Sequence, residues 1–255
     1  MADIRGPVIC VVDTAIEAAA FSPGTIIESV DFGGDCPPAG PPQAAMHGNL
    51  VAATALAECP GARLVAVRLM DGAGWLQQEE RLEAAFEWIA RRADDLGITV
   101  ICAALADMSH LRTDGPFRDS GLCQVIAELR LHGIATVMPA GNWQARFRAA
   151  NPEGMAWPAI LREVVSVGAL DPEAESPAPH RYSQRLRRRS DTGCGTTLFA
   201  RPGLPGDTSG ASAVVAGRIA AIRHIMPTAT VAQMLFRLTS GADSVMEGIP
   251  ALPSR

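Results

Sequence analysis

Short apolar runs alternate with helical patterns along most of the chain. The apolar runs are continuous, which is typical of strands buried on both faces of a parallel sheet. They lie at residues 7–12, 62–70, 98–105, 134–138 and 164–170. Segments with helical spacing or with many small residues lie at 46–56, 75–96, 121–131, 206–225 and 231–242. This alternation predicts an α/β fold: a doubly wound, mostly parallel sheet with helices on both faces, in one domain over residues 1–255.

Residues 21–42 interrupt the alternation. This segment is rich in Gly, Pro and Asp and has no hydrophobic period, so we expect a long surface loop. The overall composition is that of a globular chain, since 48% of the 255 residues are hydrophobic and 19% are charged. A chain of this length can bury a sizeable core.

The net charge and the N-terminal sequence indicate which partners and which cellular location to expect. A formal net charge of −5 favours neither nucleic acid nor a membrane as a partner. No run of about 18 apolar residues is free of charged or turn residues, so we expect no membrane span. The N-terminus lacks the basic start and apolar run of a secretion signal, and we expect no pro-domain before residue 7. The six cysteines form no Cys-x-x-Cys pair, which predicts reduced thiols and a cytoplasmic protein.

Four polar residues stand where an α/β sheet places its chemistry. Asp13 ends an apolar run, and sites of open α/β sheets lie at the carboxyl ends of strands. His47 lies in the first turn of a predicted helix, and Asn142 follows a predicted strand. Ser209 lies where a Pro/Gly loop enters a helix, beside free backbone N–H groups that suit a nucleophile whose partner becomes an oxyanion. Taken singly, each has an ordinary alternative as a cap, turn or surface residue.

The segment around Ser209 resembles the signature of a known family. Residues 207–217 read Asp-Thr-Ser-Gly-Ala-Ser-Ala-Val-Val-Ala-Gly, which resembles the subtilase (subtilisin-like serine peptidase) signature Gly-Thr-Ser-Met-Ala-Ser-Pro-His-Val-Ala-Gly. The segments at 13–15, 47–52 and 139–142 resemble the other motifs of this family, and all four stand in the family's order. The resemblance covers about residues 7–242.

The resemblance implies a serine endopeptidase that acts on a peptide or protein precursor inside the cell. It implies Ser209 as the nucleophile, His47 as the general base and Asp13 as the carboxylate that orients His47. Asn142, together with the backbone N–H of Ser209, is implied to bind the oxyanion. The expected substrate-binding residues are Ala104, Leu105, Ala106, Ala140 and Gly141.

The resemblance implies neither a catalytic metal nor an organic cofactor. Subtilases often bind structural calcium, and no ligands for calcium can be identified in this sequence. The expected partner is a peptide or protein substrate. The basic cluster from Arg181 to Arg189 is a solvated loop in the simplest interpretation and a docking site for an acidic segment in the alternative.

Three departures from the family pattern support a second hypothesis. Asp207 and Ala15 stand where the family has glycine, and only residues 204–208 remain where it usually has a longer hairpin before its serine. These departures favour a pseudoprotease that binds peptides or serves as a scaffold, whereas the complete set of Asp, His, Asn and Ser favours an active enzyme. A nucleotide-binding α/β protein is a third possibility, but the sequence has neither Gly-x-Gly-x-x-Gly nor a P-loop.

Overall fold

A seven-stranded sheet forms the centre of the protein. The computed structural model describes residues 6–34, 46–76, 78–147, 149, 151–188, 190–242, 244–246 and 248–252. The strand order in the sheet is β2-β3-β1-β4-β5-β6-β7, and every pair of neighbours is parallel. The strands are β1 (Val8–Asp13), β2 (Ile26–Asp31), β3 (Arg63–Arg68), β4 (Ile98–Ala103), β5 (Ala135–Pro139), β6 (Val165–Ala169) and β7 (Leu198–Ala200). The predicted α/β fold with a parallel sheet is therefore confirmed.

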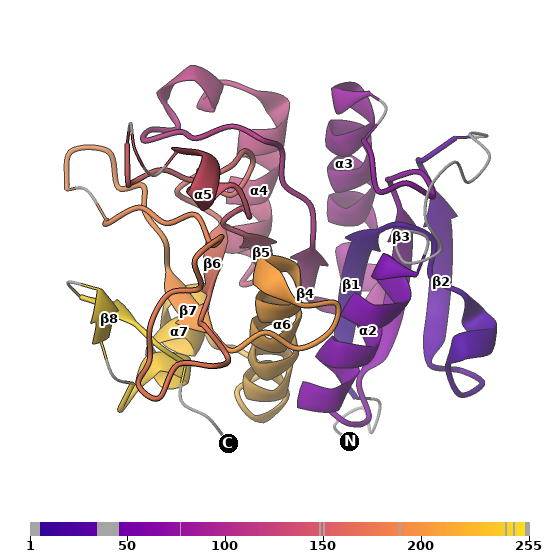
Figure 1. Cartoon of the computed structure of the whole chain (residues 1–255). Helices are drawn as coiled ribbons and strands as arrows, with labels where there is room; N and C mark the ends of the chain where they lie inside the picture. The colour runs from indigo at the N-terminus through magenta and orange to yellow at the C-terminus, as the bar shows by residue number, and fades with distance from the viewer. Residues whose placement is uncertain are drawn as a thin grey trace.

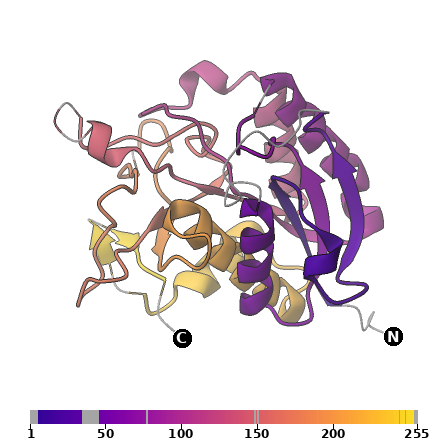
Figure 2. The same cartoon turned by 45° about the vertical axis from the view of Figure 1, so that its right-hand side comes forward.

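Helices cover both faces of the sheet (Figure 1, Figure 2). They are α2 (His47–Glu58), α3 (Glu79–Leu96), α4 (Gly121–Leu131), α6 (Asp207–Ile225) and α7 (Val231–Thr239). α3 and α4 pack on one face, whereas α2, α6 and α7 pack on the other. Successive side chains of a strand point to opposite faces, so β1 serves both layers: Val8, Cys10 and Val12 join the first, and Ile9 and Val11 join the second.

α6 passes through the middle of its layer. It is buried without interruption from Thr208 to Gly217, which requires the small residues found there. A Cβ atom on Gly217 would collide with the carbonyl oxygen of Ala55, so α2 and α6 approach each other backbone to backbone. The helix starts that carry His47 and Ser209 consequently lie at one edge of the sheet.

The prediction of a loop over residues 21–42 is wrong in part. Ile26–Asp31 forms β2, the edge strand that pairs with β3 alone. Its residues are half-buried or exposed, and it includes Glu28 and Ser29. An edge strand with solvent nearby lacks the continuous apolar run by which the other strands were predicted. Residues 35–42 lie outside the described residues.

The remaining differences concern element ends and short elements. α3 begins at Glu79, four residues after the predicted start at Trp75, and α7 ends at Thr239 before the predicted Ala242. The three-residue strand β7 was not predicted. The other short elements are η1 (Ala18–Ala20), η2 (Gly115–Phe117), α5 (Gln144–Phe147), β8 (Ser244–Met246) and β9 (Ile249–Pro250). Among the described helices, none combines the length and apolar character needed to cross a membrane.

Candidate active site

Asp13 and His47 form a partly buried hydrogen-bonded pair. Asp13 is the last residue of β1 and is fully buried, and His47 is the first residue of α2. The Nδ1 atom of His47 lies 2.7 Å from Oδ1 and 2.9 Å from Oδ2 of Asp13. A carboxylate accepts the Nδ1 proton, which leaves Nε2 as the basic nitrogen of a neutral ring.

Further hydrogen bonds hold this pair in place. The backbone N–H of Thr14 donates to Oδ1 of Asp13 at 2.7 Å, and the hydroxyl of Thr14 accepts from the N–H of Gly48 at 2.9 Å. The bond between Thr14 and Gly48 thereby joins the loop after β1 to the start of α2, beside the bond between Asp13 and His47. Thr14 supports the site although the sequence analysis assigned it no role; its signal was its position in the Asp-Thr motif.

The surroundings shift the protonation equilibrium of His47. Burial lowers its pKa, but the hydrogen bond and the negative charge of Asp13 raise it by more, so the net pKa lies above the ordinary value for histidine. The imidazolium form is thus stabilised, as a group that must receive a proton requires.

Asn142 reaches the site through a turn that requires glycine. β5 ends at Pro139, and Gly141 has φ +108°, in the region that favours glycine. A Cβ atom on Gly141 would also collide with the Gln184 side chain and with Ala156. The turn therefore depends on Gly141 for its shape and for the packing of Gln184 beneath it.

The amide of Asn142 is oriented by Thr208. Its Oδ1 accepts from the backbone N–H of Thr208 at 3.2 Å and from the Thr208 hydroxyl at 2.7 Å. A backbone N–H can only donate, so the oxygen must face Thr208 and the NH₂ group is left to donate elsewhere. Asn142 can therefore act as a donor toward the adjoining cavity.

Ser209 lies in the first turn of α6, and a neighbouring serine is already engaged. Ser209 has 9% of its surface exposed, and no hydrogen bond of its hydroxyl occurs within the described residues. Ser212 is fully buried, and its hydroxyl donates to the Thr208 carbonyl at 2.8 Å. Of these two serines, only Ser209 offers a hydroxyl to the cavity.

One cavity of about 240 Å³ brings these residues together. It is lined by His47, Asn142, Thr208 and Ser209, and by Ala104, Leu105 and Ala106 on another wall; Met70, Ala73, Gly74, Pro139 and Trp143 complete it. Ala140 and Gly141 do not line it: Ala140 is fully buried, and the carbonyl of Gly141 accepts from the N–H of Gln184. No hydrogen bond between His47 and Ser209 occurs among the described residues.

A comparison with protein families identifies the family of the chain. The subtilase family model (Peptidase_S8) matches residues 5–249. The chain belongs to the subtilase family. Its members are subtilisin-like serine endopeptidases, which are hydrolases, and this chain is one of them by that match.

Solved structures support the fold of this subtilase. It superimposes on Sphericase with a TM-score of 0.70 and 19% identity, covering 93% of this chain and 84% of that one. It superimposes on the S41 Psychrophilic Protease with a TM-score of 0.71 and 19% identity, covering 94% of this chain and 85% of that one. No curated protein matches the sequence.

Asp207, a departure of this subtilase from the family pattern, faces away from the cavity. It has φ +47° in the left-handed region, where aspartate is tolerated better than most residues, and it follows Gly206 with φ +110°. Its carboxylate lies 3.6 Å from Nδ1 of His180 and half of the side chain is exposed. Asp207 does not line the cavity that holds Ser209, and no helix cap by its side chain occurs within the described residues.

The described part of this subtilase contains no cluster of three or more His, Cys, Asp or Glu residues arranged to hold a metal ion. The calcium expected from the family stays a prediction.

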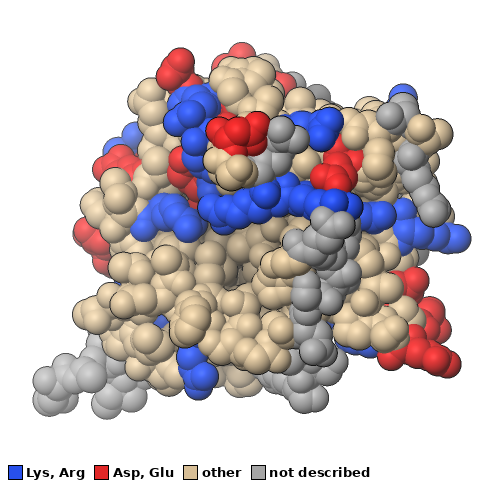
Figure 3. All heavy atoms as spheres, turned by 90° about the vertical axis from the view of Figure 1, so that its left-hand side faces the viewer, with Lys and Arg blue, Asp and Glu red and all other residues tan. Residues whose placement is uncertain are grey.

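The basic loop of this subtilase lies on one side of the molecule. Figure 3 shows a band of basic side chains across one side of the molecule, and these are all arginine because the chain contains no lysine. Arg187 pairs with Glu153 at 2.9 Å, and Arg181 stacks on the ring of Tyr182 at 4.6 Å. Arg185 donates to the Ser183 carbonyl at 3.1 Å. Several of these charges thus already contact groups of this chain, and Arg189 lies outside the described residues.

Proposed function

We propose that this subtilase is an active endopeptidase in which Asp13, His47 and Ser209 form a catalytic triad and Asn142 donates to the oxyanion. The observation that carries the proposal is the hydrogen bond of 2.7 Å between Asp13 and His47, because His47 lines the same cavity as Ser209 and Asn142. The pair leaves Nε2 of His47 as the base on the cavity side.

The reaction follows from these roles. His47 takes the proton of the Ser209 hydroxyl as the oxygen attacks the peptide carbonyl, and Asp13 stabilises the resulting imidazolium. The carbonyl oxygen becomes an oxyanion, which accepts hydrogen bonds from the Asn142 amide and the backbone N–H of Ser209. His47 then protonates the leaving amine, and water releases the acyl group by the same route. Ala104, Leu105 and Ala106 bind the substrate backbone, with Ala140 and Gly141 supporting the turn to Asn142.

A pseudoprotease is the competing function. The observation that favours it is Asp207, a residue with left-handed backbone two positions before Ser209, where the family has glycine. Such a protein would bind peptides in the same cavity without cleaving them.

Fluorophosphonate labelling distinguishes the two functions, because the reagent reacts with serines activated by a base. Mass spectrometry should place one adduct on Ser209 in the native protein. Ser209→Ala should abolish the adduct, while the neighbouring Ser212→Ala should keep it in any folded sample. An adduct on Ser212, or none on folded wild-type protein, would refute the proposed triad.

We further propose that the enzyme works in the cytoplasm on a peptide or protein precursor. The part of the chain that the structure describes contains five cysteines, all free and buried: Cys10, Cys59, Cys102, Cys123 and Cys194. Reduced thiols are typical of that compartment. Thiol titration in denaturant without reductant should find all six cysteines of the chain, Cys36 included. A protected pair would contradict this location.

The arginine loop is proposed as a secondary contact for an acidic segment of the substrate. Arg188 is the best candidate for this contact, because it is exposed and the described residues show no partner for it. Arg188→Ala should weaken binding of an acidic peptide only at low salt, since exposed charges are screened. Unchanged binding at low salt would show that the loop is a solvated segment without a role in binding the acidic peptide.

A further inference from the structure

The cavity of Ser209 is the first of three that adjoin in a row. A second cavity of about 380 Å³ shares Met70, Leu105 and Trp143 with it. A third, of about 330 Å³, shares Glu79, Asp107 and Trp157 with the second. The three cavities are thus neighbours in a row, and we take this row as the path of a peptide that enters the catalytic cavity along Ala104–Ala106.

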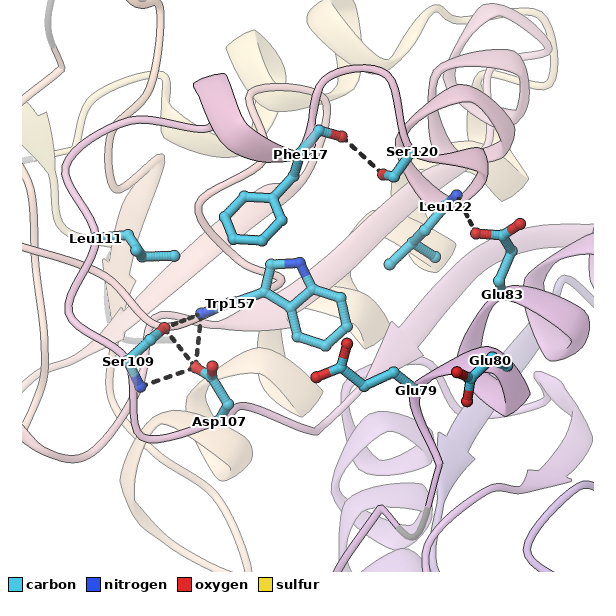
Figure 4. A pocket seen from close by; sticks show the side chains of 10 residues that line it. All are labelled: Glu79, Glu80, Glu83, Asp107, Ser109, Leu111, Phe117, Ser120, Leu122 and Trp157. Atoms are coloured by element: carbon cyan, nitrogen blue, oxygen red, sulfur yellow. Dashed lines mark hydrogen bonds between the residues drawn. The ribbon is translucent and has the colours of Figure 1, made fainter.

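The third cavity has apolar walls and an acidic side (Figure 4). It lies between the start of α3 and the segment that leads into α4. Leu111, Phe117, Leu122 and Trp157 form the apolar part, and the acidic side chains are Glu79, Glu80, Glu83 and Asp107. No Arg or His lines it among the described residues, and the chain contains no lysine. Negative charge in this cavity therefore has no neutralising cation in its lining.

Two of the carboxylates are used within the protein and two are not. Asp107 accepts from the Ser109 N–H at 3.0 Å and from the Trp157 backbone N–H at 2.9 Å. Glu83 accepts from the Leu122 N–H at 3.1 Å. Glu79 and Glu80 have no partner among the described residues. Acidic residues in a first helical turn stabilise the helix dipole, which accounts for these two by itself.

The helix dipole does not account for the aromatic residues. The rings of Phe117 and Trp157 lie 6.2 Å apart at an angle of 43°, and both border the cavity. Figure 4 shows the Glu79 carboxylate directed toward the Trp157 ring. Aromatic faces and carboxylates around one space favour an organic cation, because both attract positive charge and the rings also contact its alkyl part.

We propose that this cavity is a subsite for an arginine or lysine side chain of the peptide substrate, at a position removed from the scissile bond. The inference rests on the proposed endopeptidase function, because the path from Ser209 leads the peptide to the cavity. The cationic end lies among Phe117, Trp157 and the free carboxylates of Glu79 and Glu80, and the alkyl stem contacts Leu111 and Leu122. The enzyme therefore prefers substrates with a basic residue at one fixed distance from the cleaved bond.

Peptide binding tests the subsite without requiring catalysis. The protein is Ser209→Ala, and the probes are acetylated hexapeptide pools with arginine at one position and random residues elsewhere. Matched pools carry citrulline, which replaces the guanidinium by a neutral urea of the same shape. We expect arginine to bind about three- to thirtyfold tighter than citrulline at one position, and less so as salt rises. Equal binding of both pools at every position would overturn the inference.

A double variant that removes two negative charges tests which residues cause the arginine preference. Glu79→Gln/Glu80→Gln in the Ser209→Ala background should remove most of the arginine preference. The matched control, Glu173→Gln/Glu175→Gln, removes two exposed carboxylates that do not line the three cavities and should keep it. A preference that survives the first pair in folded protein would place the cation elsewhere. If that pair does not fold, Glu79→Gln alone is used.

The outcome is distinguishable from failure of the proposed function. Fluorophosphonate labelling of Ser209 reports the triad alone, and the hexapeptide pools report the subsite alone. Labelling without an arginine preference leaves an endopeptidase with another specificity. An arginine preference without labelling leaves a peptide-binding pseudoprotease with this subsite.

Discussion

The two sides of the candidate site are held in place by different means. On the Asp13 side, side chains make the framework: a fully buried carboxylate contacts the His47 ring, and the Thr14 hydroxyl joins the same loop to α2. On the Ser209 side, the framework is the backbone. Gly206 and Asp207 both have positive φ, and the Asp207 carboxylate is half exposed with its nearest ionic partner at 3.6 Å.

This difference shows which residues the chemistry depends on. A buried ion pair depends on the type of each residue, because removing one partner leaves the other without compensation. A backbone turn depends on the conformation that each residue can adopt, so another residue can replace glycine if it tolerates positive φ. Aspartate at position 207 is therefore compatible with an intact turn.

The largest loss of activity should come from a substitution on the Asp13 side of the site, where side chains form the framework. Asp13→Asn should lower kcat about 10⁴-fold, because the amide no longer holds the correct tautomer or stabilises the imidazolium. The acid limb of the residual activity should also move to lower pH. Asp13 raises the His47 pKa and burial lowers it, so the variant ring loses its proton at lower pH. The pH dependence of kcat/KM measures this shift.

Asp31→Asn is the matched control for this substitution. Asp31 pairs with Arg68 at 2.8 Å on the surface. Removing the Asp31 charge should leave both kcat and the acid limb of the pH profile unchanged. An acid limb that stays in place, or moves to higher pH, in Asp13→Asn would show that Asp13 does not set the His47 equilibrium.

An intermediate loss of activity should come from a substitution of Asn142, which lies between the two sides of the site. Asn142→Ala should lower kcat about 10²- to 10³-fold, with little change in substrate affinity or folding, because the oxyanion donor acts in the transition state. The measurement is a comparison of kcat and KM on a peptide substrate. A loss confined to affinity would make Asn142 a substrate-binding residue.

Asn142→Asp separates catalysis from support of Thr208. It keeps an oxygen for the two Thr208 donors and removes the NH₂ group. It should therefore lose activity at least as strongly as Asn142→Ala while keeping its stability. Normal turnover in Asn142→Asp would reduce Asn142 to a partner of Thr208.

The smallest change in activity should come from a substitution on the Ser209 side of the site, where the backbone forms the framework. Asp207→Gly should not lower activity, because glycine adopts φ +47° without strain and Asp207 does not line the catalytic cavity. Removing this anion should move the acid limb down slightly or leave it in place, and the plateau should stay or rise. Steady-state kinetics across pH measures both quantities.

Asp207→Ala tests the backbone part of this explanation. It also removes the carboxylate but keeps a Cβ atom at positive φ, so its free energy of unfolding should be about 1 kcal/mol lower than that of Asp207→Gly. A large loss of turnover in folded Asp207→Gly would reveal a catalytic or positioning role for the aspartate.

Most of the fold could be predicted because burial leaves a local pattern. Strands buried on both faces require continuous apolar runs, and this requirement marked β1, β3, β4, β5 and β6 in advance. The positions of Asp13, His47, Asn142 and Ser209 at strand and helix ends could be inferred in the same way. His47, Asn142 and Ser209 line one cavity, and Asp13 lies behind His47, to which it is hydrogen-bonded. Two strands escaped prediction: the edge strand β2, because its half-exposed residues need no such run, and β7, which is buried but only three residues long.

Packing between distant segments decided the rest. The sequence carries no signal that the Asn142 oxygen is engaged by Thr208, or that Asp207 turns toward His180 instead of the cavity. Nor does it indicate that Glu79 and Trp157, from two separate segments, line the same space. Hydrophobic periodicity reports only which side of an element is buried. Which side chains then meet depends on how the layers pack, and the packing is a property of the whole chain.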